Sequence, residues 1–501
     1  MILNSTTRNT HVRLIRDVSW PFPGMDSVRQ IFPTFEKGQS IDESDITAHI
    51  NDWSVSWNLG EPFATINLKC DSFHELQYLN LNDIIIIDLL NRKSKSLICA
   101  GLVSGNTVST SCDKQITRGY TILAKEPGKM LQNHEIYYNP YTEGIEALNP
   151  YLALTGGQLG LFGSPKQIIE KILDLKMFGY DPAGNPTQFL GGFYMNDGRR
   201  IMDWIDLSNM LNRENPVLSD PMMSSSLQQL IRKDPCDFSY WPTNGSSIDG
   251  PLWRLMQTYS AQPMYELFTY TDYRNEKPVQ LIFHRPLPFW CEYYGWELWD
   301  SLQCFEFHQG ELSGNASFSW SEDEAASYYF INAQQTLCGA EVVALQSLLT
   351  NFNHYGVDVV IPIIENAFYE RYGFKKLIPG INAIALDNSA TKETREDQRK
   401  LSLDILHNAI LRLWDYNFLN QYYLSGSISI PLPMDRPIPR IGMRAKNLTS
   451  GFEYYIVGVS ISGGIGKTTV ANLKLTRGMT RTMHQHLTSK SVRKNILSGG
   501  V

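Results

Sequence analysis

The sequence predicts a multidomain α+β protein in which short antiparallel strands dominate. Three observations indicate this class. The chain has 501 residues, which corresponds to about three domains of average size. Aromatic residues make up 12% of the chain and charged residues only 19%, which favours strands and excludes disordered, collagen-like and coiled-coil classes. Alternating apolar and polar residues fill both end regions, whereas helical periodicity is concentrated in between.

The first 135 residues predict an arm followed by a small β domain. Residues 1–24 carry three arginines and indicate an N-terminal arm or a first edge strand. Between 25 and 135, strand patterns recur at short spacing, at 53–57, 63–68, 83–88, 97–103 and 119–123. The 84–87 run is apolar throughout, so we expect that strand to be buried on both faces. Strands this short, joined by Gly, Asn and Ser turns, predict a closed barrel or a sandwich.

Residues 136–279 predict a mixed α/β domain. Ser164 at the N-cap and Pro165 at the first helical position predict a helix over 165–178. Further helical patterns cover about 201–212, 225–233 and 251–260. Two strand patterns, 265–270 and 278–283, are separated by a polar turn, which predicts an antiparallel hairpin.

The remaining chain predicts further strands around a helical insertion. Strand patterns at 302–318 and 328–333 precede helical patterns over 340–353 and 392–423, and the charges that begin the second helix are expected to be solvated. Strands return at 425–431, 452–461 and 468–476. Residues 479–501 form a basic C-terminal tail without acidic residues, which we expect to be mobile or ordered by a partner.

Charge, cysteines and apolar runs exclude several classes of protein. The net charge of -7 gives no electrostatic basis for binding nucleic acid or anionic lipid over the whole surface. The seven cysteines are widely spread and never form a C-x-x-C pair, which favours reduced structural thiols over a disulfide framework or a zinc site. The sequence contains no secretory signal, and no apolar run approaches the roughly 18 residues of a transmembrane helix. We therefore expect a soluble protein made in a reducing cytoplasm.

The segment 462–469, Ser-Gly-Gly-Ile-Gly-Lys-Thr-Thr, looks like the phosphate-binding loop of ParA-type ATPases. In such a loop the glycines would free backbone amides for phosphate, a lysine would reach the β- and γ-phosphates, and a threonine would hold Mg²⁺. These residues would be Gly463, Gly464, Gly466, Lys467 and Thr468. However, the chain ends soon afterwards, no acidic residue follows, and the next residues alternate as in a strand. We therefore expect a hairpin turn, and we predict no cofactor.

Three other clusters could carry chemistry, but each has a simpler structural explanation. The glycine-rich 156–163 segment could bind an anion, yet it fits a junction between a loop and a helix. His484 and His486 could ligate a metal but have no further ligands nearby, and the acidic residues 322–324 fit the first turn of a short helix. No nucleophile and base pattern stands out. The sequence therefore predicts no catalytic residue, no metal site and no enzyme.

Taken in order, thirteen short segments resemble the central baseplate hub family of contractile phage tails. That family includes the late-control D proteins and the hub part of type VI secretion spikes. The segments are 82–88, 101–105, 119–123, 128–131, 251–256, 262–268, 281–289, 327–332, 370–374, 424–430, 439–443, 454–460 and 473–478. Their order carries the resemblance. The most specific element is Tyr-Tyr-x-x-Gly-Val-Ser at 454–460, followed by a strand that ends in Thr-Arg-Gly at 476–478.

The resemblance implies a hub-type architecture of two tube-like antiparallel β-barrels with mixed α/β insertions. The first barrel would span 25–135, and the second would be split between 280–335 and 424–478, with an α/β insertion at 336–423. It also implies a homotrimer that joins the hexameric tail tube to the trimeric spike and lines the central channel of a virion tail baseplate.

The implied partners are the tail tube protein, the spike protein, other baseplate proteins and DNA in passage through the lumen. No stable membrane insertion is expected. The basic tail offers candidates for docking the spike, namely Arg481, Lys490, Arg493 and Lys494. Two alternative functions remain open: a nucleotide-binding ATPase that uses the 462–469 loop, and a tail-associated cell-wall hydrolase.

Overall fold

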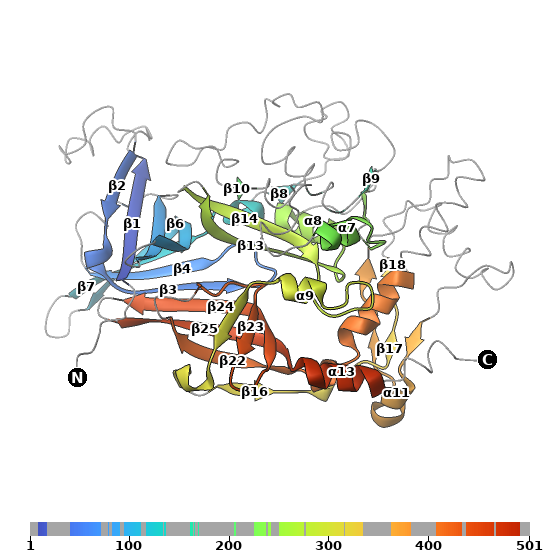
Figure 1. Cartoon of the computed structure of the whole chain (residues 1–501). Helices are drawn as coiled ribbons and strands as arrows, with labels where there is room; N and C mark the ends of the chain where they lie inside the picture. Colours follow the sequence, from blue (N-terminus) through green and yellow to red (C-terminus); the bar gives the residue numbers. More distant parts are fainter. Residues whose placement is uncertain are drawn as a thin grey trace, which may run out of the picture.

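The fold is given by a computed structural model of the whole chain (Figure 1). It describes residues 9–17, 41–71, 79, 83–90, 95–111, 117–133, 135–136, 161–163, 165, 169, 205–206, 225–236, 239–241, 250–274, 277–314, 316–333, 362–381, 407–432, 437–464 and 467–490. Within these residues the structure is mostly antiparallel sheet with few helices, as the predicted α+β class requires.

A 13-stranded sheet built from both end regions of the chain dominates the structure. The N-terminal region contributes β1 (Asn9–Asp17), β2 (Ile41–Asp45), β3 (Ile50–Asn58), β4 (Thr65–Asp71), β5 (Ile84–Leu90), β6 (Lys95–Ser111) and β7 (Thr117–Lys125). The C-terminal half contributes β15 (Cys304–Phe307), β16 (Ser317–Ser319), β22 (Leu424–Pro431), β23 (Arg444–Asn447), β24 (Glu453–Gly464) and β25 (Lys467–Met479). The strand order is β16-β22-β25-β24-β3-β4-β7-β6-β5-β1-β2, and β23 joins β15 to β24.

The two regions meet where β24 pairs with β3. These strands run antiparallel, from Gly458 opposite Asn58 to Gly464 opposite Asp52, and Figure 1 shows them side by side in red and blue. Because β3 also pairs with β4, and β24 with β25, the sheet continues on both sides of this junction. Among the described strands the path is open from β16 to β2, and no closed barrel is found.

The burial of the strands follows from their sequence patterns. All of β5 except its last residue is buried, which confirms the expected strand with two covered faces. In β3 the alternate residues Trp53, Val55 and Trp57 are at most 2% exposed, and they pack in one core with Ile461 and Leu473 of the C-terminal strands. Burial of a large apolar side chain contributes roughly 1.5–3 kcal/mol, so this shared core holds the two ends of the chain together.

The predicted hairpin of the middle region is confirmed. Strands β13 (Tyr265–Arg274) and β14 (Lys277–Pro286) pair antiparallel along their whole length. Phe268, Leu281 and Phe283 belong to the same core cluster as β3 and β24. The hairpin therefore packs against the main sheet.

The helices are short. They are α2 (Lys129–Asn133), α7 (Ser225–Arg232), α8 (Leu252–Tyr259), α9 (Glu297–Ser301), α11 (Asn366–Tyr372), a helix over 407–417 and α13 (Arg481–Lys490), with 3-10 turns at Thr47–His49, Gln309–Glu311, Glu322–Glu324 and Asn420–Tyr422. None of the helices within these described ranges is long and apolar enough to cross a membrane. The predictions for 225–233, 251–260 and the acidic turn at 322–324 are confirmed.

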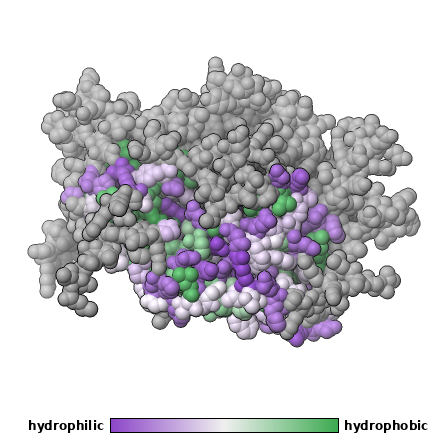
Figure 2. All heavy atoms as spheres, viewed as in Figure 1, coloured by the Kyte–Doolittle hydropathy of each residue, from purple (hydrophilic) through white to green (hydrophobic). Residues whose placement is uncertain are grey.

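Two-stranded and three-stranded sheets complete the fold. The pairs are β8 (Glu135–Ile136) with β12 (Gly250–Pro251), β9 (Leu161–Gly163) with β11 (Ser239–Trp241), and β18 (Asn332–Ala333) with β21 (Gly380–Ile381). A three-stranded sheet contains β17 (Tyr328–Tyr329), β19 (Ile363–Ile364) and β20 (Lys376–Leu377). On the face shown in Figure 2, hydrophilic side chains cover much of the described surface and hydrophobic ones lie in small groups.

Two sequence predictions are wrong at described positions, and the basic tail, which was expected to be mobile or ordered by a partner, begins with an ordered helix. Residues 205–206 form the short strand β10 beside β14 and not a helix, because pairing with a buried hairpin overrides a weak helical pattern. The strand β1 lies between β2 and β5 and not at a sheet edge. The tail is helical over Arg481–Lys490. Most of the predicted 165–178 helix, the 340–353 helix and the 392–406 part of the long helix lie outside the described residues.

Candidate functional site

The glycine-rich segment forms the end of the hairpin between β24 and β25. Gly464 pairs with Lys467 across this end, and residues 465–466 lie outside the described residues. A Cβ atom at 463 would lie 2.8 Å from the Trp53 ring, and one at 464 would lie 2.3 Å from the Asn51 carbonyl oxygen. Close approach to β3 therefore explains two of the glycines without a phosphate.

Lys467 and Thr468 begin strand β25, so no helix N-terminus follows the glycines. The Lys467 ammonium forms an ion pair with the Asp52 carboxylate of β3. A phosphate-binding loop needs the opening turn of a helix, whose amides and dipole stabilise the anion. The segment is a hairpin, as expected, and its lysine is already paired with a carboxylate.

Replacement of Lys467 by alanine is expected to lower the free energy of unfolding by less than about 1 kcal/mol, because both partners of the ion pair are half exposed. Adenine and guanine nucleotides should leave the melting temperature of both forms unchanged in a thermal shift assay. Asp52→Ala is the matched control and should behave like Lys467→Ala. A nucleotide-dependent rise in melting temperature that Lys467→Ala abolishes would contradict the hairpin assignment.

The basic tail begins with helix α13, which packs against the rest of the chain. Arg481 donates to Asp300 of α9, with 3.1 Å from Nη1 to Oδ2, and lies 3.7 Å from Glu453 Oε2 of β24. The hydrogen bond to Asp300 raises the pKa of Arg481. Of the other predicted docking residues, Lys490 is the last residue of α13, and Arg493 and Lys494 lie outside the described residues.

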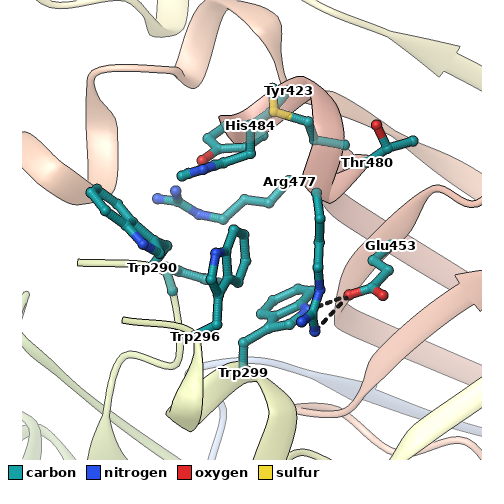
Figure 3. Close-up of a pocket in the computed structure, with 11 residues that line it drawn as sticks. Trp290, Trp296, Trp299, Tyr423, Glu453, Arg477, Thr480 and His484 are labelled. Atoms are coloured by element: carbon teal, nitrogen blue, oxygen red, sulfur yellow. Dashed lines mark hydrogen bonds and ion pairs between the residues drawn. The ribbon is translucent and has the colours of Figure 1, made fainter. Parts of the chain in front are cut away.

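A small pocket lies between α13, α9 and the end of β25 (Figure 3). Three tryptophans line it, Trp290, Trp296 and Trp299, and His484 of α13 lies across from them. The ring centroid of His484 is 4.7 Å from that of Trp296 and 5.1 Å from that of Trp290. With a volume of about 30 Å³, the pocket has room for about one water molecule and none for a nucleotide or a sugar.

His484 is buried inside this aromatic pocket. The residue is 3% exposed, and its Nε2 atom has no hydrogen-bond partner among the described residues. Burial lowers the pKa of His484 to about 4, because the charged imidazolium would lose its hydration. His486 points to solvent on the same helix, so the two histidines do not share a site. No group of three potential metal ligands was found within the described part of the chain.

Arg477, near the end of β25, forms one wall of the pocket. Its backbone φ of +57° is left-handed, which is unusual for a residue with a side chain. The guanidinium carbon lies 3.8 Å from the centre of the Phe289 ring and 5.3 Å from that of Tyr423, and Nη1 donates to the Tyr416 carbonyl. Arg477 belongs to the Thr-Arg-Gly end of the most specific resemblance segment, so that segment contributes directly to the pocket.

Docking of α13 is expected to weaken as the pH falls from about 6.5 to 4. The released helix takes up a proton at His484 near pH 6.5, whereas the docked helix does so only near pH 4. Between these values the released form binds more protons, so acid favours release by about 1–3 kcal/mol. The fluorescence of Trp290 and Trp296 over a pH titration measures this change. His484→Phe should remove this pH dependence, and an unchanged titration curve in that variant would exclude His484 as its source.

Sequence reasoning missed two buried polar clusters that hold the fold together. The first joins the carboxylate of Asp234 to the guanidinium of Arg412, which are 0% and 3% exposed in their side chains. The second surrounds Glu126, which is 0% exposed and accepts hydrogen bonds from Trp57 and Thr271. The sequence signal for Arg412 is its position between Leu411 and Leu413 on an amphipathic helix.

No protein-family model and no curated protein matches the sequence. A 43 kDa tail protein of prophage MuSo2 from Shewanella oneidensis is 10% identical with a TM-score of 0.41, and the match covers 93% of this chain and 98% of that one. The chain is similar to phage tail proteins.

Two further solved structures extend this similarity. A tail protein from Neisseria meningitidis MC58 is 8% identical with a TM-score of 0.43, and 93% of this chain and 96% of that chain are covered. The E. coli c3393 protein, a component of the type VI secretion system, is 9% identical with a TM-score of 0.34, over 86% of this chain and 74% of that one.

Proposed function

We propose that this protein is the structural baseplate hub of a contractile tail. In this role a homotrimer joins the hexameric tail tube to the trimeric spike and lines the central channel. The observation that carries the proposal is the junction between β3 and β24. Because of it, the segments of the resemblance that lie in β5, β6, β7, β22, β24 and β25 all belong to one sheet. A continuous sheet with one core is a rigid wall, which is what a channel-lining scaffold requires.

We also propose the two tube-like barrels that the resemblance implies. In the described chain β2 and β16 are the free ends of the main strand path. Unpaired strand edges favour association with other strands, and pairing between copies would hide them. In a closed ring of three copies, the free edge strands of every copy would pair with a neighbour in the same way. The net charge of -7 is consistent with a lumen that repels passing DNA.

The spike, the tube protein and other baseplate proteins are the proposed partners, and the virion tail baseplate is the proposed location. In the basic tail, Lys490, Arg493 and Lys494 are proposed to contact the spike. Arg481 would contribute only after it leaves Asp300 and Glu453. The proposed role is not enzymatic, so zymography on cell walls should show no clearing.

Native mass spectrometry of the purified chain, alone and with the spike protein of the same particle, tests the proposal. The expected result is a complex with three copies of this chain, formed alone or on the spike. A chain that stays monomeric in the presence of the spike would overturn the hub assignment. Electron microscopy of the particle gives an independent readout, because the hub must lie between tube and spike.

A further inference from the structure

We propose that helix α13 is exchanged between copies of this chain, so that α13 of one copy packs against Trp290, Trp296 and Asp300 of the next. This inference rests on the proposed homo-oligomer. The structure supplies three arguments, which concern the chemistry of the pocket, the connection to α13 and the weakness of its docking.

The groups that contact Arg481 and His484 of α13 lie on other elements of the chain. Asp300 of α9 and Glu453 of β24 converge on Arg481. The indole of Trp299 donates to Glu453 at 2.6 Å and holds that carboxylate in place. Acidic groups therefore meet the basic start of α13, and aromatic rings meet His484 one turn later. This complementarity does not depend on the covalent connection, so α13 of a second copy carries the same matching groups.

The connection between β25 and α13 is short and follows a strained residue. Only Thr480 separates Met479, the last residue of β25, from Arg481. Arg477 has a left-handed backbone, and the next residue, Gly478, is so close to Tyr454 that a Cβ atom there would lie 2.2 Å from its ring. Short connections under strain are the ones that favour exchange of a terminal element between identical chains.

The docked helix is held by few strong contacts. Asp300 and Arg481 are 45% and 37% exposed in their side chains, so solvent screens their attraction. Nε2 of His484 is buried without a partner among the described residues, which opposes docking. A free helix of this length is only marginally stable in water. These features make the docking of α13 weak, so α13 of a neighbouring copy can compete for the same contacts.

Charge reversal in full-length chains tests the exchange. One chain carries Arg481→Glu, which reverses the charge at the start of α13. The other carries Asp300→Arg, which reverses the charge on α9 that faces it. Each chain alone then mismatches every α13, whereas a mixture restores the match between unlike copies, which are two of the three contacts in a three-copy ring. The two chains are co-expressed with different tags, and the mixed complex is captured on one tag and quantified by the other. A single chain with both changes is the matched control for folding and for pairing within one copy.

If α13 is exchanged, co-expression of the two different variants should give at least five times more doubly tagged complex than co-expression of two differently tagged copies of the same variant. The doubly changed chain should assemble like the unaltered one. Equal capture in all combinations, while the doubly changed chain recovers its thermal stability, would show that α13 stays in its own copy. If the unaltered chain still forms three-copy complexes in that case, the exchange fails and the proposed hub stands. A chain that never assembles would reject the hub as well.

Discussion

Asp234→Ala is expected to lower the free energy of unfolding by about 3–5 kcal/mol, because it leaves the Arg412 guanidinium buried without its carboxylate. In the folded protein both nitrogens at the end of Arg412 donate to Asp234, at 2.6 and 2.5 Å. Tyr265 and Tyr294 donate to the same carboxylate at 2.9 and 2.5 Å. Burial, followed by the charge of Asp234, raises the pKa of Tyr294 and keeps it a donor. The Cys236 amide also donates to Asp234, at 2.7 Å, so the substitution removes the shared acceptor of five buried donor groups.

Urea denaturation followed by circular dichroism measures this effect. Asp300→Ala is the matched control, because Asp300 is 45% exposed in its side chain and pairs with Arg481 at the surface. In that control the free energy of unfolding should fall by no more than about 1 kcal/mol. Equal losses in the two variants would show that the Asp234 cluster contributes no more than a surface ion pair.

Glu126→Ala is expected to lower the free energy of unfolding by about 3–5 kcal/mol, because several buried donors lose one shared acceptor. Oε1 of Glu126 accepts from the Trp57 indole at 3.1 Å and from the Thr271 hydroxyl at 2.7 Å. Oε2 accepts from the Ala64 amide at 2.7 Å. The carboxylate thus ties β3, the residue before β4 and the β13 strand together.

Glu126→Gln separates the acceptor role from simple packing. The amide keeps one oxygen and nearly the same volume, so an intermediate loss is expected in the same denaturation assay. The exposed Glu61 provides a control, since Glu61→Ala should change stability by less than about 0.5 kcal/mol. If Glu126→Ala were as mild as that control, the cluster would not be what joins the hairpin to the sheet.

Local sequence patterns predicted the strands well because the alternation of side chains in a strand is a property of neighbouring residues. The wholly apolar run at 84–87 predicted a strand covered on both faces, and β5 is one. The β13–β14 hairpin was predicted for the same reason, since its two strands and its turn are contiguous. The strand patterns on both sides of Gly463, Gly464 and Gly466 predicted a turn at these glycines.

Pairing between distant segments could not be predicted in this way. Nothing in the residues around Ser462 indicates that β24 pairs with β3, which is some 400 positions away. Charged residues such as Asp234 and Arg412 look like ordinary surface residues until their partner is known. The tail was expected to be mobile or partner-ordered because its composition is basic, whereas α13 docks through residues of α9 and β24.

The sequence was therefore sufficient for the strand-rich α+β class, for most of the described strands and for the rejection of a phosphate-binding loop. These features depend on periodicity and turn residues over a few positions, where local preferences are strong. The tertiary structure alone revealed the single sheet shared by both ends, the buried carboxylates and the pocket that holds α13. Each depends on which distant surfaces come together, and that choice is made by the burial of the whole core and not by any one segment.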